Sequence, residues 1–400
     1  MRLYLLALNP TDSVTEGFLP AAERLGLDVT VLTHDPAPHR RARYPAGVEV
    51  IGCDVREIRE VIGAITQHRV PDAVFSNSDH LQVQTALAAD YFGLPGKDWR
   101  VALRTKNKAQ LRRHLAACGA DAVWCAELAP DQDPGVLPDT SQVRYPCVIK
   151  PREGVASEDV VLAEDDRELV ARCREIQARR PGAALVVEEF LAGGLRTLET
   201  LGDIAGARHV LGGFRTELSP LPYFIEERLV FDPEPPPGAV DQVLAQLDAL
   251  GVAFGACHTE YVVRDGRARL IEVNYRAIGD HGDLLLGGLL GIPLFERILR
   301  VHLGEPLPAD LGVRTGGRAR VDYPYADRAG TLTAAPEAAE LALGGVRLTY
   351  RPLRPVGERH ALYHTNRDYL GVLRTTGTDQ AAVDRAAAEF LAAQRWEIAP

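Results

Sequence analysis

The sequence predicts an α/β protein whose N-terminal part contains a doubly wound parallel sheet and whose remainder is α+β. Two observations support this fold class. Strand-like and helix-like runs alternate through the first hundred residues, which is typical of a parallel sheet covered by helices. After Leu94-Pro95-Gly96 the alternation stops, and strand-like runs lie close together, as hairpin partners do. We therefore expect three domains, with residues 1–103, 104–305 and 306–400 as their bounds.

The first domain is expected to contain four strands and three helices. Its strands are short apolar runs, namely Leu3–Leu8, Val29–Leu32, Val48–Ile51 and Ala73–Ser76. Its helices show apolar residues at helical spacing, in Val14–Leu25, Val55–Gln67 and His80–Phe92. No G-x-G-x-x-G follows the first strand, so no dinucleotide site is predicted. We expect this domain to shape one wall of a cleft.

The second domain mixes strands and helices, and the last hundred residues contain short strands and turns. The expected helices are Lys106–Cys118, Asp165–Ala178, Ala239–Leu250 and, near the end of the chain, Asp379–Gln394. The expected strands are Cys147–Lys150, Val160–Leu162, Leu185–Phe190 and two more on either side of Asp265-Gly266. Four prolines mark Asp232–Gly238 as a surface connection.

Composition excludes several classes of protein. The chain has 400 residues, of which 46% are hydrophobic and 25% charged, as in soluble globular proteins. A net charge of −10 argues against a general nucleic-acid binder. The longest apolar stretch, Leu284–Phe295, is broken by glycines and a proline and is too short to span a bilayer, so no membrane partner is expected.

The termini and the cysteines favour a cytoplasmic protein. The N-terminus enters a strand-like run at once and lacks the features of a signal peptide. The six cysteines form no C-x-x-C pair, so neither a zinc ribbon nor a disulfide framework is indicated. We expect reduced thiols in the core.

Three oxygen-bearing side chains form a candidate metal site. Glu272 and Asn274 are two residues apart on one predicted strand, so they project from the same face. Glu260 lies on the preceding strand. Carboxylate and amide oxygens are the ligands that Mg²⁺ prefers. The alternative is the solvated face of an exposed hairpin, but the apolar residues around Glu272 favour the metal.

The turn between these strands decides whether the carboxylates meet. A two-residue turn at Asp265-Gly266 pairs Arg264 with Arg267. That turn would therefore pair Glu260 with Ile271 and leave Glu272 on the other face, so a two-residue turn would exclude a shared metal. We therefore expect an odd-length loop or a β-bulge that pairs Glu260 with Glu272.

Two lysines and a strand end are weaker signals. Lys150 ends an apolar strand and is followed by small residues up to Ser157, a pattern that can place ammonium and N–H groups against phosphates. Lys108 lies on the helix before it. Glu188 and Glu189 end another apolar strand, whose edge could pair with an adenine ring. Each feature alone is also consistent with an ordinary solvated surface.

The order of these features resembles the ATP-grasp superfamily, most closely its L-amino-acid ligases and carnosine-synthase-like enzymes. The resemblance covers roughly residues 104–304, and the first hundred residues suit the domain that precedes this fold in the family. It implies a two-lobed ATP-grasp fold after a pre-ATP-grasp domain. The motifs that carry it are Asn107-Lys108 with Arg112, Tyr145–Pro151, Val187–Leu191, Gly255–Glu260 and Leu270–Arg276.

The resemblance implies a role for each matched residue. Lys108 and Lys150 would hold the ATP phosphates, with Ser157 as a donor from the covering loop. Backbone groups near Glu188, Glu189 and Leu191 would meet adenine. The metal ligands Glu260, Glu272 and Asn274 would bind one or two Mg²⁺, or Mn²⁺, and Arg276 would stabilise an acyl phosphate. One departure is that Ala156 and Asp159 stand where the family often has glycine.

The substrate side is less clearly marked. Arg215 could clamp a substrate carboxylate, or it could be a surface arginine. Residues 279–283 open a predicted helix, whose N-terminus is a natural anion site. Asp280 or Asp283 could cap this helix or bind an amine, and His281 could line the site or simply be polar.

The expected activity is that of an ADP-forming ligase. ATP would phosphorylate a small carboxylate, such as an amino acid, and an amine would then attack to give an amide or peptide-like bond, with secondary metabolism as one setting. Two alternatives stay open: an enzyme that phosphorylates bicarbonate, and an ATP-binding module without catalysis. The expected partners are small-molecule carboxylates and amines and, in a homodimer, a second copy of the chain.

Overall fold

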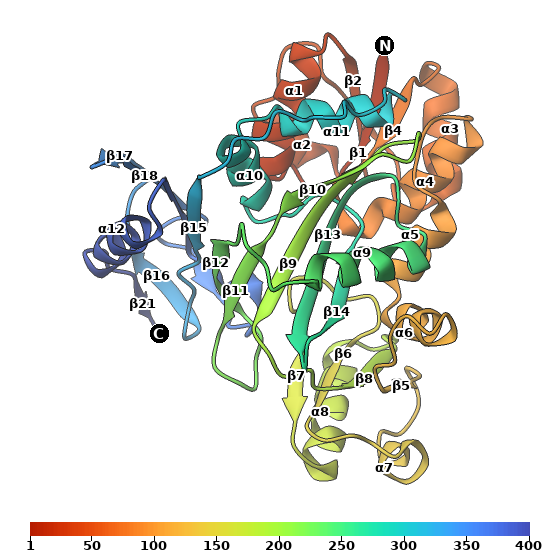
Figure 1. Ribbon diagram of the computed structural model, residues 1–400, viewed down its shortest axis with the longest axis vertical. Helices are drawn as coiled ribbons and strands as arrows, with labels where there is room; N and C mark the ends of the chain where they lie inside the picture. The colour runs from red at the N-terminus through yellow and green to blue at the C-terminus, as the bar shows by residue number, and fades with distance from the viewer.

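The computed structural model describes residues 1–400, apart from the side chain of Thr140. Its described residues form one parallel sheet near the N-terminus and antiparallel sheets in the rest of the chain (Figure 1), which confirms the predicted fold class.

The N-terminal sheet is parallel and has the order β3-β2-β1-β4. Its strands are β1 (Arg2–Leu6), β2 (Asp28–Thr33), β3 (Glu49–Gly52) and β4 (Ala73–Phe75). Its helices are α1 (Leu19–Arg24), α2 (Pro36–Arg41), α3 (Ile58–His68) and α4 (Gln82–Tyr91). A π-helical turn, Ser13–Phe18, leads into α1, and a 3₁₀ turn, Asp79–Leu81, leads into α4. Every residue of β1 is buried, as its continuous apolar sequence predicts.

Two helices replace the single helix expected from Lys106 to Cys118. Helix α5 spans Trp99–Lys106, and α6 spans Lys108–Ala117. The chain breaks at Asn107, which has an extended backbone and whose side chain accepts a hydrogen bond from the Gln110 N–H at 3.0 Å. Asparagine is a favoured N-cap, so this residue starts a new helix instead of continuing the first.

A four-stranded sheet, here called the small lobe sheet, follows α6. It contains β5 (Cys125–Leu128), β6 (Cys147–Pro151), β7 (Val161–Ala163) and β8 (Leu185–Glu189) in the order β5-β8-β6-β7. Helix α7 (Val136–Ser141) precedes β6, and α8 (Asp166–Arg179) packs against β6 and β7. Strand β8 is paired on both sides, so the expectation that its edge is open for adenine is wrong.

A ten-stranded antiparallel sheet, here called the large sheet, forms the centre of the molecule. Its order is β14-β13-β9-β11-β12-β15-β20-β18-β17, and β10 pairs with β9 outside this path. The strands up to residue 305 are β9 (Leu195–Gly202), β10 (Arg208–Gly212), β11 (Phe214–Leu218), β12 (Glu226–Phe231), β13 (Gly255–Arg264) and β14 (Arg267–Asn274). Helix α9 (Ala239–Leu250) connects β12 to β13.

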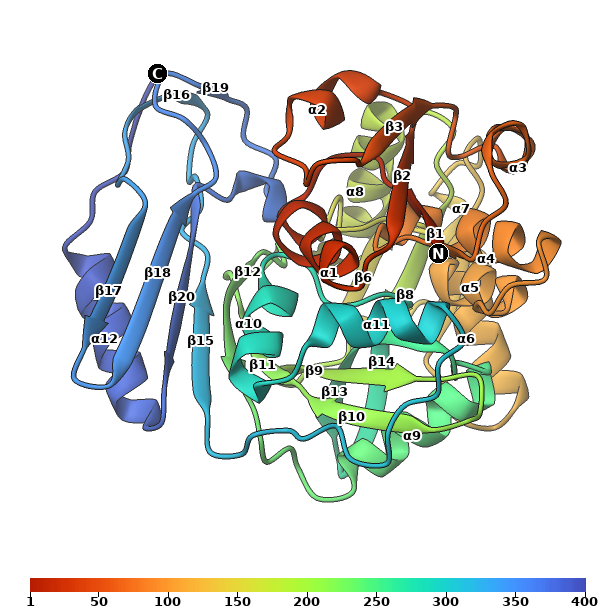
Figure 2. The ribbon, with the colours of Figure 1, turned by 90° about the horizontal axis from the view of Figure 1, so that it is seen from above.

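Residues 306–400 extend the large sheet. Strands β15 (Arg318–Asp322), β17 (Ala339–Leu343), β18 (Val346–Pro352) and β20 (Gly371–Gly377) join it through the pairing of β15 with β12. A small sheet is formed by β16 (Gly330–Ala334), β19 (Arg359–His360) and β21 (Glu397–Ala399). Helix α12 (Gln380–Ala392) packs against β15, β18 and β20. Figure 2 shows these strands at one side of the molecule.

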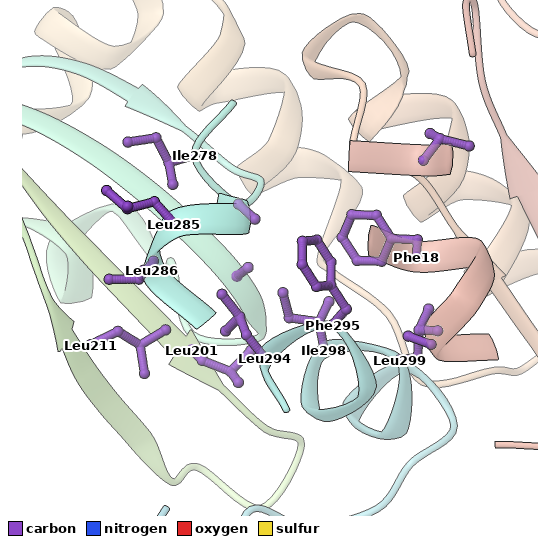
Figure 3. Close-up of a cluster of buried hydrophobic side chains, with 14 of the residues drawn as sticks. Phe18, Leu201, Leu211, Ile278, Leu285, Leu286, Leu294, Phe295, Ile298 and Leu299 are labelled. Atoms are coloured by element: carbon purple, nitrogen blue, oxygen red, sulfur yellow. The ribbon is translucent and has the colours of Figure 1, made fainter. Parts of the chain in front are cut away.

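A shared core joins the N-terminal sheet to the large sheet. Helices α10 (Gly282–Leu290) and α11 (Leu294–His302) lie between them. Phe18 packs edge-on against Phe295 with ring centroids 4.9 Å apart, and Ile298 and Leu299 belong to the same buried cluster (Figure 3). The N-terminal sheet is therefore fixed against the elements that carry the site.

The hairpin of β13 and β14 has both a two-residue turn and a bulge. Arg264 pairs with Arg267, and Asp265 and Gly266 both have positive φ, as a type I′ turn requires. The register shifts between Glu260 and Tyr261, so Glu260 pairs with Glu272. The expected bulge is therefore confirmed, but the expectation that a two-residue turn excludes a shared face is wrong. The turn alone would have separated the carboxylates, and the extra residue, Ile271, brings them together.

The cysteines only partly follow the expectation of core thiols. All six are free, and Cys147, Cys173 and Cys257 are buried, whereas Cys118 is exposed at the end of α6. Across the described residues, none of the helices combines the length and the apolar character needed to cross a membrane.

Candidate active site

A cavity of about 460 Å³ is lined by both the small lobe and the large sheet. This volume is typical of small-molecule sites. The lining also includes Asp79 and His80 from the N-terminal domain, as expected for a domain that shapes one wall, and Asn366 from the C-terminal region.

Lys108 and Lys150 both reach this cavity and are both only 5% exposed. The Lys108 Nζ lies 2.9 Å from Glu272 Oε1 and donates to the Gly154 carbonyl at 3.1 Å. Burial alone would lower the pKa of Lys108, but the neighbouring Glu272 carboxylate outweighs it and raises the pKa. Lys108 is therefore a buried cation held beside the candidate metal ligands.

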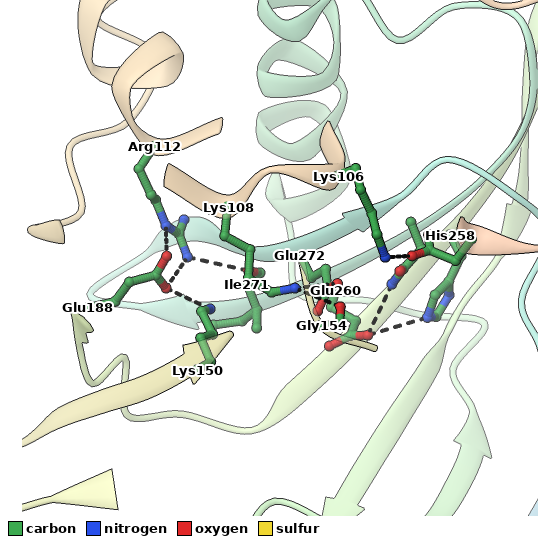
Figure 4. Close-up of polar contacts among 12 residues, drawn as sticks. Lys106, Lys108, Arg112, Lys150, Gly154, Glu188, His258, Glu260, Ile271 and Glu272 are labelled. Atoms are coloured by element: carbon green, nitrogen blue, oxygen red, sulfur yellow. Dashed lines mark hydrogen bonds and ion pairs between the residues drawn. The ribbon is translucent and has the colours of Figure 1, made fainter. Parts of the chain in front are cut away.

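Glu188 is held by two cations. Its carboxylate accepts hydrogen bonds from Arg112 at 3.0 and 2.9 Å and lies 2.7 Å from the Lys150 Nζ (Figure 4). Burial would raise the pKa of Glu188, but Arg112 and Lys150 lower it to about 2. The ionised Glu188 side chain thus positions Lys150, and its carboxylate oxygens are occupied by Arg112 and Lys150.

The hinge between the lobes begins where β8 ends. The Phe190 N–H donates to the Pro146 carbonyl at 3.0 Å, and the Glu189 side chain accepts from the Trp124 N–H at 2.7 Å. Leu191 lines the cavity, and its N–H has no hydrogen-bond partner within the described part of the chain. Of the predicted adenine-binding positions, Leu191 therefore offers the free backbone donor.

The predicted metal ligands come together on the hairpin. Glu260 and Glu272 face each other across the ladder, both line the cavity, and the Asn274 side-chain amide donates to Glu260 Oε1 at 3.4 Å. Burial would raise the pKa of Glu260, but His258, Lys108 and Arg276 lower it, so its carboxylate is ionised. Among the described residues no group of three His, Cys, Asp or Glu side chains has metal-binding geometry. Two carboxylates and an amide nevertheless suit a hard cation.

His258 extends this cluster, and the sequence reasoning missed it. Its Nδ1 lies 2.7 Å from Glu199 Oε1, and its Nε2 lies 3.6 Å from Glu260 Oε1. Burial would lower the pKa of His258, but Glu199 and Glu260 raise it to about 10, so the imidazole is protonated. Its position two residues before Glu260 is the signal that could have identified it, because alternate residues of a strand share a face.

Glu226 is another lining residue without a local sequence signal. Burial and the nearby carboxylates of Glu260 and Asp280 raise the pKa of Glu226 to about 8. Its side chain reaches the cavity from β12, on the opposite side of β9 and β11 from the metal hairpin. Glu226 comes close to the metal-ligand candidates only because of the order of the strands in the sheet, and a local sequence pattern does not reveal that order.

The loop between β6 and β7, residues 152–159, is here called the phosphate loop. Gly154, Ala156 and Ser157 line the cavity. Ala156, Ser157 and Asp159 have φ of 55°, 55° and 53°, a conformation that favours glycine. The loop therefore adopts the backbone expected of a glycine-rich segment, although it lacks glycine at these positions.

Arg276 and Asp280 line the cavity, whereas Arg215, His281 and the fully buried Asp283 lie outside it. Arg215 is exposed on β11, because alternation along that strand turns Phe214 and Thr216 inward and Arg215 outward. His281 is buried, and its Nε2 pairs with Asp12 at 2.8 Å. These two assignments are corrected: Arg215 is a surface residue, and His281 links the start of α10 to the N-terminal domain.

A protein-family model matches the part of the chain that contains most of this site. The model of the ATP-grasp domain matches residues 143–283, which include the phosphate loop and the whole metal hairpin. The chain carries an ATP-grasp domain. This domain contains Lys150, the hinge and all three candidate metal ligands.

Over its whole length the chain is similar in fold to several solved structures. An L-amino acid ligase from Bacillus licheniformis is similar with a TM-score of 0.81 and 22% identity, and the match covers 100% of this chain and 99% of that one. The biotin carboxylase domain of the Hydrogenobacter thermophilus 2-oxoglutarate carboxylase is similar with a TM-score of 0.71 and 16% identity, covering 100% and 90%. An uncharacterised protein of Sinorhizobium fredii is 26% identical, over 100% of this chain and 84% of its own length.

Proposed function

We propose that this ATP-grasp protein is an ADP-forming ligase that activates a carboxylate as an acyl phosphate for attack by an amine. One observation carries the proposal. Two buried lysines, two paired carboxylates, Asn274 and Arg276 converge on a single cavity. Phosphoryl transfer requires positioning and neutralisation of charge more than covalent participation by the protein, and this set of side chains supplies both.

Each residue has a distinct role in this scheme. Lys108 and Lys150 would bind phosphate oxygens, and the Leu191 N–H would donate to adenine. Glu260, Glu272 and Asn274 would hold Mg²⁺, which when bound neutralises phosphate charge. Arg276 would stabilise the acyl phosphate and the tetrahedral adduct that the amine forms. The Asp280 carboxylate, with Glu226 beside it, suits a cationic substrate group at that end of the cavity.

The assay that tests this proposal measures ADP release. Purified protein with MgATP is given panels of amino acids and other small carboxylates, each with and without an amine, and bicarbonate alone. We expect ADP only when both a carboxylate and an amine are present, together with an amide product found by mass spectrometry. The similarity to a biotin carboxylase domain described in complex with MgADP and bicarbonate makes bicarbonate the necessary comparison. ADP release with bicarbonate alone would favour the carboxylating alternative.

An Arg276→Ala variant tests the assignment of the catalytic residue. Because Arg276 is expected to act on the acyl phosphate, the variant should bind MgATP normally and lose at least about 100-fold in turnover, the magnitude typical of lost oxyanion stabilisation. Arg267→Ala, an exposed arginine on the same hairpin, is the matched control and should retain activity. Normal turnover in Arg276→Ala would contradict the role, and ATP binding without ADP release in any mixture would favour a silent binding module.

A further inference from the structure

The phosphate loop is contacted by residues 366 and 367 of the C-terminal region. The Asn366 N–H donates to the Ala156 carbonyl at 3.3 Å, and Arg367 forms an ion pair with Glu158. Glu158 lies 2.5 Å from Arg180, and Asp159 pairs with Arg179 at 2.7 Å. The loop is thus bound to residues that are distant in sequence on both of its sides.

The conformation of the loop requires such contacts. A left-handed backbone is unfavourable for alanine, serine and aspartate, and this loop contains three such residues within four positions. Strained conformations persist only where surrounding contacts determine them. Glycine would adopt the same backbone without that support.

The segment that provides the contacts is itself held by hydrogen bonds and by a ring stack. Residues 363–367, here called the C-terminal clamp, fold around the fully buried Asp368, which accepts hydrogen bonds from the Tyr363 and Thr365 N–H groups at 3.0 and 3.2 Å. The ring of His364 stacks on Tyr223 at 4.1 Å. The clamp can therefore serve as a fixed support.

The clamp also touches the opposite wall of the cavity. The Asn366 Oδ1 accepts from the Glu226 N–H at 3.1 Å, and Asn366 itself lines the cavity. One short segment therefore links the phosphate loop to the strand that carries Glu226.

We propose that the C-terminal clamp holds the phosphate loop in its left-handed, nucleotide-binding conformation, with Arg367 and Asn366 as positioning residues. These contacts stabilise a backbone conformation that glycine residues would adopt without them. The proposal rests on the proposed function only in that the loop covers the phosphates of a bound nucleotide. Arg367 is 59% exposed, but Glu158 is 8% exposed and shares its carboxylate with Arg180, so Arg367 belongs to a network and is not an isolated surface pair.

Two measurements on the full-length protein test the clamp without requiring turnover. One is the hydrogen–deuterium exchange of peptides covering residues 152–159, and the other is the Kd for Mg²⁺–AMP-PNP by calorimetry. Both are compared for wild type, Arg367→Ala, Arg367→Lys and Arg385→Ala. Arg385 is an exposed arginine of α12 with no ion pair in the described part of the chain, so it is the matched control.

We expect Arg367→Ala to exchange the phosphate loop faster and to weaken nucleotide binding, each by about fivefold, since an ion pair of a partly exposed network is of that order. Arg367→Lys should recover most of the loss, and Arg385→Ala should match wild type. A double variant of Arg367→Ala and Glu158→Gln should bind no worse than Glu158→Gln alone, because Glu158→Gln already removes the contact with Arg367.

Other outcomes would overturn the clamp. One is that Arg367→Ala keeps the loop exchange rate and the nucleotide affinity of wild type. The other is that the faster exchange in Arg367→Ala extends over the whole chain. Failure of the proposed function looks different: wild type then binds Mg²⁺–AMP-PNP but releases no ADP with any substrate, while the effect of Arg367→Ala on the loop persists.

Discussion

Glu272 has two partners in this site, the candidate metal and the ammonium group of Lys108. Replacing it with glutamine removes a charged ligand and leaves Lys108 without its ion-pair partner. We expect Glu272→Gln to abolish Mg²⁺-dependent ADP formation and to lower the free energy of unfolding by about 1–3 kcal/mol, as measured by urea denaturation. Asp265→Asn changes an exposed carboxylate at the turn of the same hairpin and should preserve both quantities. Near-normal turnover of Glu272→Gln would exclude it as a ligand.

A second carboxylate links stability to pH. Asp283 is fully buried at the start of α10, and burial raises its pKa to about 6 from 3.8. Between these values the folded protein keeps a proton that the unfolded chain has lost. The associated stabilisation is therefore complete below pH 3.8 and is lost as pH rises through 6. An Asp283→Asn variant does not titrate, so its stability relative to wild type should increase by about 2 kcal/mol between pH 4 and pH 7. Unfolding curves at both pH values check this, and a difference that does not change with pH would contradict it.

At the level of single elements, the contact between β9 and β11 depends on a glycine. A Cβ at Gly213 would lie 1.9 Å from the Thr197 carbonyl oxygen, so any side chain there separates the two strands. We expect Gly213→Ala to cost about 3 kcal/mol or more of stability and to displace Thr197, whose hydroxyl donates to Glu199 at 2.9 Å. Gly194→Ala, where a Cβ meets nothing within 4 Å, is the control. Equal melting temperatures for the two variants would refute the expectation.

Elements with a local signal were predictable, and elements defined by distant partners were not. The apolar run of β1 predicted a buried strand of the parallel sheet. The alternation along β14 predicted that Glu272 and Asn274 share a face. The bulge at Ile271 followed from requiring Glu260 and Glu272 to meet. Arg215 could not be placed, because alternation along β11 does not say which face is inward. Glu226 and Asn366 reach the cavity through pairings between strands far apart in the chain, which no local pattern records.

For the whole molecule, the large sheet makes residues 306–400 part of the structural framework. Strand β15 pairs with β12, and Tyr323 and Tyr369 belong to the core that also contains Phe18. A chain ending at Glu305 would expose the edge of β12 and lose that apolar contact. We expect this truncated protein to aggregate or to lack cooperative unfolding by circular dichroism. A soluble fragment with a sharp transition would indicate that residues 1–305 fold independently.

The ion pair between Lys108 and Glu272 has a consequence for how ligands bind together. A divalent cation on Glu272 and a phosphate on Lys108 would each break the same contact. The ligand that binds first loses the free energy needed to separate Lys108 from Glu272. The second ligand then binds to a residue whose ion pair is already broken. Such a shared cost is a positive coupling free energy, and linkage makes it reciprocal. Bound metal should therefore raise the affinity for the nucleotide by the same factor as bound nucleotide raises the affinity for the metal. The two ligands then bind cooperatively.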